Sequence, residues 1–201
     1  MKLFLKLIYE IYIILIYFGF KISPPNIILN APKIKFSPEV IEDIHADTAF
    51  STLEKQYILQ AAKEWELFSN NKIKFNIIFD LNIIDYSLVK DKSTIIKVHS
   101  SAEIIKSMDQ KLNSDTLGIC YYTSDTTRAI YMVFDRLQKL NLFKCTMMHE
   151  LGHYINLGHT DGHSIMNKHI KYNIYFPTYK DAVEFGNKWE FNPNECKYIL
   201  F

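Results

Sequence analysis

The 201-residue sequence predicts one domain of the α+β class, built from both helices and strands. Three observations predict it. Apolar residues recur at helical spacing from Leu53 to Phe68, several short strand-like segments follow, and a second helical segment surrounds His149. A chain of this length has room for one domain of ordinary size with a sizeable core.

The first half of the domain predicts a strand, a long helix and two more strands. Alternation at Ile34-Lys35-Phe36 favours a first strand, and Ser51-Thr52 is a plausible cap for the helix that runs from Leu53 to Phe68. Further strands are expected at Lys72 to Phe79 and at Thr94 to His99. The polar segment between these two strands predicts a loop or a short helix.

The second half predicts a strand pair followed by two helices. Leu117 to Tyr122 and Ala129 to Phe134 are the paired strands, joined by a polar turn. Asn141 is the expected cap of the helix that carries His149, and Thr178 to Lys188 is a capped last helix.

The first twenty residues differ from the rest of the chain. Lys2 and Lys6 precede a mostly apolar run ending at Phe20, which is the order found in a secretory signal. No small-residue cleavage site follows, and the run is about long enough to span a bilayer. We therefore expect a hydrophobic signal or membrane anchor at residues 1–20. Glu10 keeps an alternative open, an amphipathic helix packed on the domain, because a carboxylate is costly in an apolar centre.

This expectation divides the chain into three parts: the signal or anchor, a proline-containing tether at residues 21–33, and the folded domain at residues 34–201. It also predicts a domain outside the cytoplasm, either secreted or anchored to the membrane. The net charge of +1 argues against nucleic acid as a partner, because nucleic-acid-binding domains usually carry a basic excess on one face.

The segment His149-Glu150-Leu151-Gly152-His153 carries the clearest chemical signal. Two histidines four residues apart project from one face of a helix and can bind one metal ion. Imidazole nitrogens are good zinc ligands, and a nearby carboxylate such as Glu150 can take a proton from a water on the metal. A catalytic zinc normally has three protein ligands and one open position, so a third ligand is required.

His159 is the candidate third ligand, six residues after His153. A continuing helix would carry His159 away from the metal-binding face, so the helix must end and the chain must turn back. Asn156 is the expected turning point, because asparagine is second only to glycine at the left-handed position that closes a helix.

These residues resemble the metzincin signature H-E-x-x-H-x-x-G-x-x-H followed by a Met-turn. The match includes His149, Glu150, His153 and His159, and departs at Asn156, where the family usually has glycine. Met166 lies seven residues after His159 and resembles the Met-turn methionine. The order of elements resembles the matrixin catalytic domain from about Lys33 to Trp189. This resemblance implies a metzincin-like zincin fold of the three-layer α/β type, with a twisted mixed sheet, a long first helix, an active-site helix, a Met-turn and a C-terminal helix.

The resemblance implies a zinc-dependent endopeptidase with one catalytic Zn²⁺. Its ligands would be His149, His153 and His159, and Glu150 would be the general base that takes a proton from the attacking water and passes one to the leaving amine. Met166 would be a packed floor under the metal, and Asp181 matches an aspartate that braces the Met-turn in the family.

The resemblance also implies where a peptide or protein substrate binds. An extended peptide would be held by the main chain of the edge strand, as in strand addition. Tyr172 would form part of the specificity pocket, although the family proline after the methionine is missing here. His163 and His169 are close enough in sequence to reach the rim of the cleft. The substrate-contacting strand residues would be Leu117, Gly118, Ile119, Cys120 and Tyr121.

Two other functions compete with the endopeptidase. One is a membrane-tethered, non-catalytic module on the same fold, in which zinc is only structural; Glu150 argues against it, because a structural site has no use for a carboxylate there and usually closes its fourth position. The other is a metallohydrolase that acts on something other than peptides. The sequence leaves the oligomeric state open.

Overall fold

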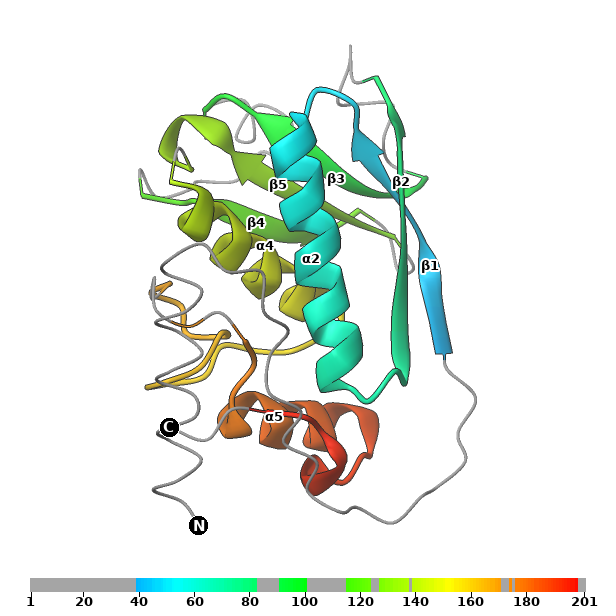
Figure 1. Ribbon diagram of the computed structural model, residues 1–201, viewed down its shortest axis with the longest axis vertical. Helices are drawn as coiled ribbons and strands as arrows, with labels where there is room; N and C mark the ends of the chain where they lie inside the picture. The colour runs from blue at the N-terminus through cyan, green and yellow to red at the C-terminus, as the bar shows by residue number, and fades with distance from the viewer. Residues whose placement is uncertain are drawn as a thin grey trace.

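A five-stranded sheet forms the centre of the computed structural model, which describes residues 39–82, 91–100, 115–123, 127–137, 139–170, 174 and 176–198. Its strand order is β2-β1-β3-β5-β4 (Figure 1). The strands are β1 (Glu39–Asp47), β2 (Ile73–Leu81), β3 (Ser93–Val98), β4 (Gly118–Tyr122) and β5 (Arg128–Val133). All neighbours run parallel except β4, which pairs antiparallel with β5 and forms one edge of the sheet.

Most of the predicted strands are confirmed, and so is the mixed α and β character of the domain. The strand expected at Ile34-Lys35-Phe36 lies outside the described residues, as do residues 1–20 and the tether. β1 was not predicted. Its pairing with β2 shifts register between Ile41 and Asp43, so an irregularity interrupts the alternation on which a strand prediction depends.

Helix α2 (Thr52–Phe68) is the predicted long helix. Ser51 caps it: the Glu54 N–H donates to the Ser51 hydroxyl, while the Ser51 N–H donates to the Glu54 carboxylate. Its buried face packs on the sheet through residues at helical spacing, including Ile58, Ala61 and Trp65. The Trp65 indole N–H also donates to the backbone oxygen of Met148 at 2.8 Å. This hydrogen bond ties α2 to the helix that carries the histidines.

That helix is α4 (Leu140–Tyr154), which packs beside α2. Lys139 is its N-cap and makes no side-chain capping bond, so the prediction that Asn141 caps this helix is wrong: Asn141 lies one residue inside it. The short helix η2 (Phe134–Arg136) leads from β5 into α4. Helix α5 (Tyr179–Trp189) has the predicted cap at Thr178, completed by Asp181, and η3 (Pro193–Glu195) follows it.

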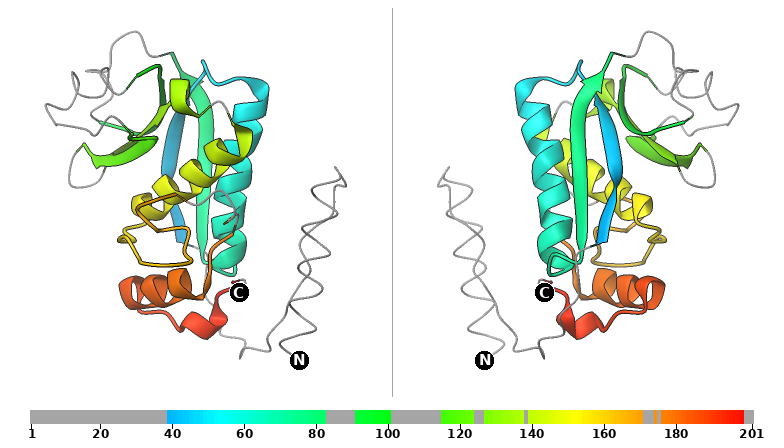
Figure 2. Two further views of the ribbon diagram at one scale, coloured as in Figure 1. Left: turned by 90° about the vertical axis from the view of Figure 1, so that its left-hand side faces the viewer. Right: turned by 90° about the vertical axis from the view of Figure 1, so that its right-hand side faces the viewer.

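Helices α2 and α4 cover the same face of the sheet (Figures 1 and 2). Both contribute to one hydrophobic core together with residues such as Ile95 and Ile130, whereas their neighbours Ile96 and Tyr131 belong to a separate cluster on the opposite face. The described residues thus form two layers, and the predicted third layer is not seen among them. Helix α4 contacts β4 and β5, whereas α2 contacts β2, so α4 lies beneath the β4 edge (Figure 1).

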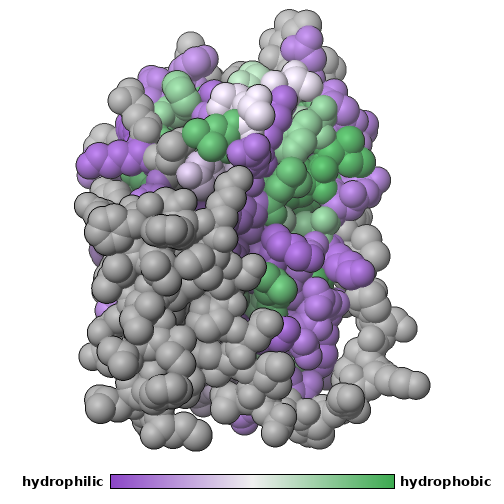
Figure 3. Space-filling view, in the orientation of Figure 1, coloured by the Kyte–Doolittle hydropathy of each residue, from purple (hydrophilic) through white to green (hydrophobic). Residues whose placement is uncertain are grey.

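Hydrophobic side chains reach the surface at the opposite end of the sheet (Figure 3). Figure 3 shows hydrophobic side chains over β2 and the adjoining flank of α2, where Leu59 is exposed and Lys55 lies 5.5 Å from the centre of the Phe79 ring. Within the described ranges, no helix combines the length and apolar character that a membrane span requires.

Candidate metal centre

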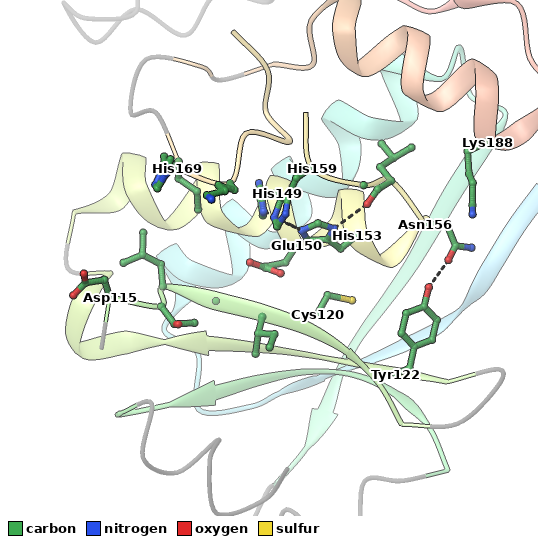
Figure 4. A pocket seen from close by; sticks show the side chains of 18 residues that line it. Asp115, Cys120, Tyr122, His149, Glu150, His153, Asn156, His159, His169 and Lys188 are labelled. Atoms are coloured by element: carbon green, nitrogen blue, oxygen red, sulfur yellow. Dashed lines mark hydrogen bonds between the residues drawn. The ribbon is translucent and has the colours of Figure 1, made fainter. Parts of the chain in front are cut away.

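Helix α4 presents His149 and His153 side by side, as their four-residue spacing predicts (Figure 4). Their ring centroids are 4.6 Å apart and the rings are nearly perpendicular, at 86°. His149 is buried and His153 is half-buried. Packing of α4 on α2 and the sheet therefore fixes both rings on a rigid element.

The chain reverses after α4 through a left-handed residue at Asn156, as predicted from its sequence. Its φ is 68°. The Asn156 N–H donates to the His153 carbonyl at 2.9 Å, and the Leu157 N–H donates to the Gly152 carbonyl at 3.0 Å. This pair of bonds is a Schellman motif, which ends the helix and satisfies two of its last carbonyls.

The reversal brings His159 to the other two histidines. Its Nε2 lies 3.1 Å from the Nε2 of His153, and its ring lies 5.3 Å from that of His149, measured between centroids. One ligand nitrogen from each histidine lies within 4.8 Å of the others, and this is the one such cluster of three or more metal-binding side chains among the described residues. The three histidines are therefore close enough to bind a metal ion together.

Backbone carbonyls determine which ring nitrogens face the centre of this cluster. The Nδ1 of His149 lies 2.8 Å from the carbonyl oxygen of Ile165, and the Nδ1 of His153 lies 2.8 Å from that of Leu157. A carbonyl oxygen only accepts, so each Nδ1 must carry the proton and donate it. In the neutral rings both Nε2 atoms then present lone pairs.

Those two Nε2 atoms are 3.0 Å apart. Two acceptors at this distance cannot share a hydrogen bond when both rings are neutral, and they repel one another unless a cation lies between them. Two imidazole nitrogens that bind one tetrahedral zinc ion are about 3.3 Å apart. The geometry and the tautomers both fit a metal ion.

The histidines also favour the neutral form that metal binding requires. Burial, together with repulsion from His153 and His159, lowers the pKa of His149 to about 3. Burial is also the main reason why the pKa values of His153 and His159 lie below the usual range, and Lys168 adds to the effect at His159. These lowered pKa values favour neutral imidazole rings, in which one ring nitrogen keeps its proton and the other is free to bind a metal ion.

Glu150 is buried in the same cleft, between α4 and the edge strand β4. Burial raises its pKa to about 8, although a hydrogen bond from the backbone of Cys120 acts in the opposite direction. Gly118 lies directly against this carboxylate: a Cβ atom there would lie 3.1 Å from Oε1 of Glu150 and 2.9 Å from Cγ2 of Thr146. Only glycine lets the edge strand approach Glu150 so closely.

Met166 packs under the helix, where the sequence predicted a Met-turn. It is fully buried, and its sulfur would lie 2.2 Å from a Cβ added at Gly152, so Gly152 makes room for it. The buried carboxylate of Asp181 accepts hydrogen bonds from the N–H groups of Ile165 and Met166, both at 3.2 Å, and from the Ser164 hydroxyl. Asp181 thus braces this turn and caps α5 at once.

A cleft of about 870 Å³ runs between β4 and the histidines. Figure 4 shows Asp115 and His169 at one end and Tyr122, Asn156 and Lys188 at the other. The predicted strand residues Leu117, Gly118, Ile119 and Cys120 line it.

Other predicted cleft residues have different outcomes. Tyr121 is not among the residues that line the cleft, whereas its neighbour Tyr122 is. Tyr172 lies outside the described residues. Of the two histidines near the rim, His169 lines the cleft and His163 does not.

The edge strand turns alternate backbone groups toward the cleft. The Val133 N–H donates to the Leu117 carbonyl at 2.9 Å, which places Leu117 in a hydrogen-bonded pair with β5. Because such pairs alternate along an antiparallel ladder, the backbone groups of Gly118, Cys120 and Tyr122 point away from β5. The cleft thus has a polar main-chain wall opposite the histidines.

Sequence reasoning did not single out Arg128 or Lys188, which lie near this site. Neither belongs to a motif, and only the fold brings them there.

A scan of this chain against models of known protein families finds no match, and a search of curated proteins finds no relative.

Proposed function

We propose that this protein is a zinc-dependent endopeptidase with a metzincin-like fold. One observation carries the proposal: three histidine nitrogens converge on one point, two of them with lone pairs fixed toward it by backbone carbonyls, and a buried glutamate lies in the same cleft. A set of three histidines with space on its open side is typical of a catalytic zinc site.

His149, His153 and His159 would hold the metal. When bound, zinc would polarise the scissile carbonyl and make water a usable nucleophile at neutral pH. Backbone carbonyls that accept from Nδ1 orient the first two rings and increase their basicity as ligands. His159 completes the set from the loop side.

Glu150 would act as the general base and then as the acid. Its carboxylate takes a proton from the attacking water and delivers one to the leaving amine. Burial raises its pKa to about 8, whereas a cation held by the histidines favours the ionised form. These opposing effects suit a group that must both accept and return a proton near neutral pH.

The substrate would be an extended peptide laid beside β4. The backbone groups of Gly118, Cys120 and Tyr122 point away from β5, so they offer the main-chain donors and acceptors that strand addition uses. One of them, the Cys120 N–H, already bonds to Glu150, so a peptide next to it would lie beside the base. A secreted or membrane-anchored location belongs to the same proposal.

The main alternative is a non-catalytic zinc-binding module on the same fold. Two observations weigh against it: Glu150 is buried at the cost of a strongly raised pKa, and the cleft leaves one side of the histidine cluster open. A metallohydrolase that acts on another bond is the second alternative, and a substrate panel separates it from a peptidase.

The test is proteolysis by the full chain. Cleavage of a denatured protein is measured before chelation, after chelation and after zinc is restored, and again with Glu150→Gln. We expect zinc-dependent cleavage that falls at least about 1000-fold in the variant, because the base is lost while the ligands remain. Asp115→Asn, which changes another carboxylate of the cleft, is the matched control and should stay within a few-fold of wild type. Zinc binding without proteolysis in any form would favour the non-catalytic module.

A further inference from the structure

We infer that the side chain of Asn156 positions the third metal ligand, His159, by tying the turn after α4 to strands β4 and β5. Asn156 itself binds no metal in this arrangement. The inference rests on the proposed metal centre and adds a residue that acts on it from outside the ligand set.

Two donors from the sheet converge on one oxygen atom of Asn156. The Tyr122 hydroxyl, at the end of β4, donates to Oδ1 at 2.5 Å, and the Arg128 guanidinium, at the start of β5, donates to it at 2.9 Å. Figure 4 shows Tyr122 reaching across the cleft to Asn156. An amide oxygen has two lone pairs, so both donors can be satisfied together.

The donors are themselves held in place by aromatic packing. The Arg128 guanidinium lies 4.5 Å from the centre of the Tyr122 ring and 5.4 Å from that of Tyr154, the last residue of α4. Cation–π contacts of this kind restrain both partners. Tyr122, Arg128 and Asn156 thus form a clamp between the sheet edge and the end of the histidine-bearing helix.

His159 needs such support more than the other ligands do. His149 and His153 stand on α4, and each has its Nδ1 bonded to a backbone carbonyl. For His159, which is exposed, no hydrogen bond to Nδ1 is seen among the described residues. Its position therefore depends on the backbone of the loop from Asn156 to Thr160.

That loop is fastened at both ends. At its far end the Thr160 N–H donates to the Met166 carbonyl at 3.0 Å. At its near end the Schellman motif sets the backbone, and the clamp fixes where the turn lies relative to the sheet. Glycine would serve the left-handed φ of 68° as well as asparagine does, so the backbone alone does not require this side chain.

Asn156→Gly separates the two roles, because it keeps the turn accessible and removes the clamp. We expect zinc to bind about 10-fold more weakly to the full-length variant, measured by competition with a chelator, as is usual when a group that orients a ligand is lost. The visible spectrum of the Co²⁺-loaded variant should also change, because the third imidazole is less well placed. Asn156→Asp keeps the acceptor and should restore both readouts.

Tyr122→Phe gives an independent test, since it removes one donor and keeps the ring over Arg128. Tyr122 is half exposed, at 52%, so the variant should fold, and Tyr121→Phe on the same strand is the matched control. We expect Tyr122→Phe to bind zinc more weakly than wild type and Tyr121→Phe to bind it as wild type does. Wild-type affinity and cobalt spectra in both Asn156→Gly and Tyr122→Phe would overturn the positioning role. A wild-type chain that binds no zinc would overturn the metal centre itself.

Discussion

The helix side and the loop side of the histidine cluster are built on different principles. His149 and His153 stand on α4, packed against α2 and the sheet, and each has its ring anchored by a carbonyl. His159 stands on an exposed turn whose position depends on contacts at Asn156 and Thr160. The helix side has its geometry before any metal binds, while the loop side depends on restraints from distant parts of the chain.

This difference has a thermodynamic consequence. Removing a residue from the helix side should damage both the fold and the metal site, because the same contacts hold both. Removing one from the loop side should affect metal binding with little effect on the metal-free protein. Single substitutions can therefore separate the two sides.

The largest effect is expected from removing each histidine in turn. His149→Ala should abolish tight zinc binding and also lower the melting temperature of the chelated protein, because His149 is buried and bonded to Ile165. His159→Ala should weaken zinc binding by at least about 100-fold, yet leave the chelated protein close to wild type. Chelator competition and thermal melts measure the two quantities.

His169→Ala, which removes an exposed histidine of the same cleft, is the control for both. Equal loss of stability in the chelated His149→Ala and His159→Ala proteins would contradict the distinction between the two sides.

A substitution in the turn that packs beneath the three histidines should also lower the free energy of unfolding. Asp181→Ala leaves the buried Ser164 hydroxyl and the Ile165 N–H without their acceptor and removes the cap of α5. We expect it to reduce the free energy of unfolding by about 3 kcal/mol, measured by urea denaturation. Asp161→Ala, at an exposed position before the turn, should change it by less than about 0.5 kcal/mol. Similar values for the two variants would mean that Asp181 does not brace the turn.

A smaller effect is expected from pH in the chelated protein, with opposite signs for two groups. The pKa of His149 is lowered to about 3, so below about pH 6.5 the unfolded chain binds a proton that the folded chain does not, and stability falls as the pH falls. The pKa of Glu150 is raised to about 8, so the folded chain binds the extra proton between about pH 4.5 and 8, and stability falls as the pH rises.

Thermal melts of the chelated protein from pH 5 to 9 test the second effect. Glu150→Gln removes the ionisable group, so the variant should keep its stability as the pH rises from 5 to 8, the range over which wild type loses stability. Parallel melting curves for the two proteins across this range would contradict the raised pKa.

The smallest effect is expected at His163. It is exposed and does not line the cleft, although it lies four residues after His159 in the same loop region. His163→Ala should leave zinc affinity and proteolysis within about 2-fold of wild type, and stability within about 0.5 kcal/mol. A clear loss of zinc affinity would show that the loop side extends further than the clamp at Asn156.

The features that the sequence predicts correctly are those that depend on local sequence patterns. The four-residue spacing of His149 and His153, the left-handed preference of Asn156 and the caps at Ser51 and Thr178 each depend on a few neighbouring residues, and the structure has all of them. Each is a case in which a short sequence strongly favours one backbone conformation.

The remaining features depend on residues that are far apart in the sequence. Gly118 packs on Glu150, and Tyr122 and Arg128 meet Asn156, only because β4 and β5 are placed over α4. No periodicity signals such contacts. The irregular pairing of β1 has a related cause, since a register shift of one residue moves a side chain to the other face of a sheet.

The central claim is that three imidazoles share one metal ion. X-ray absorption at the zinc edge of the full chain, loaded with one zinc per molecule, tests it most directly. We expect three imidazole nitrogen ligands at about 2.0–2.1 Å together with one oxygen ligand, and only two imidazole ligands in His159→Ala. A spectrum that His159→Ala leaves unchanged would contradict the claim, because His159 would then not be a ligand.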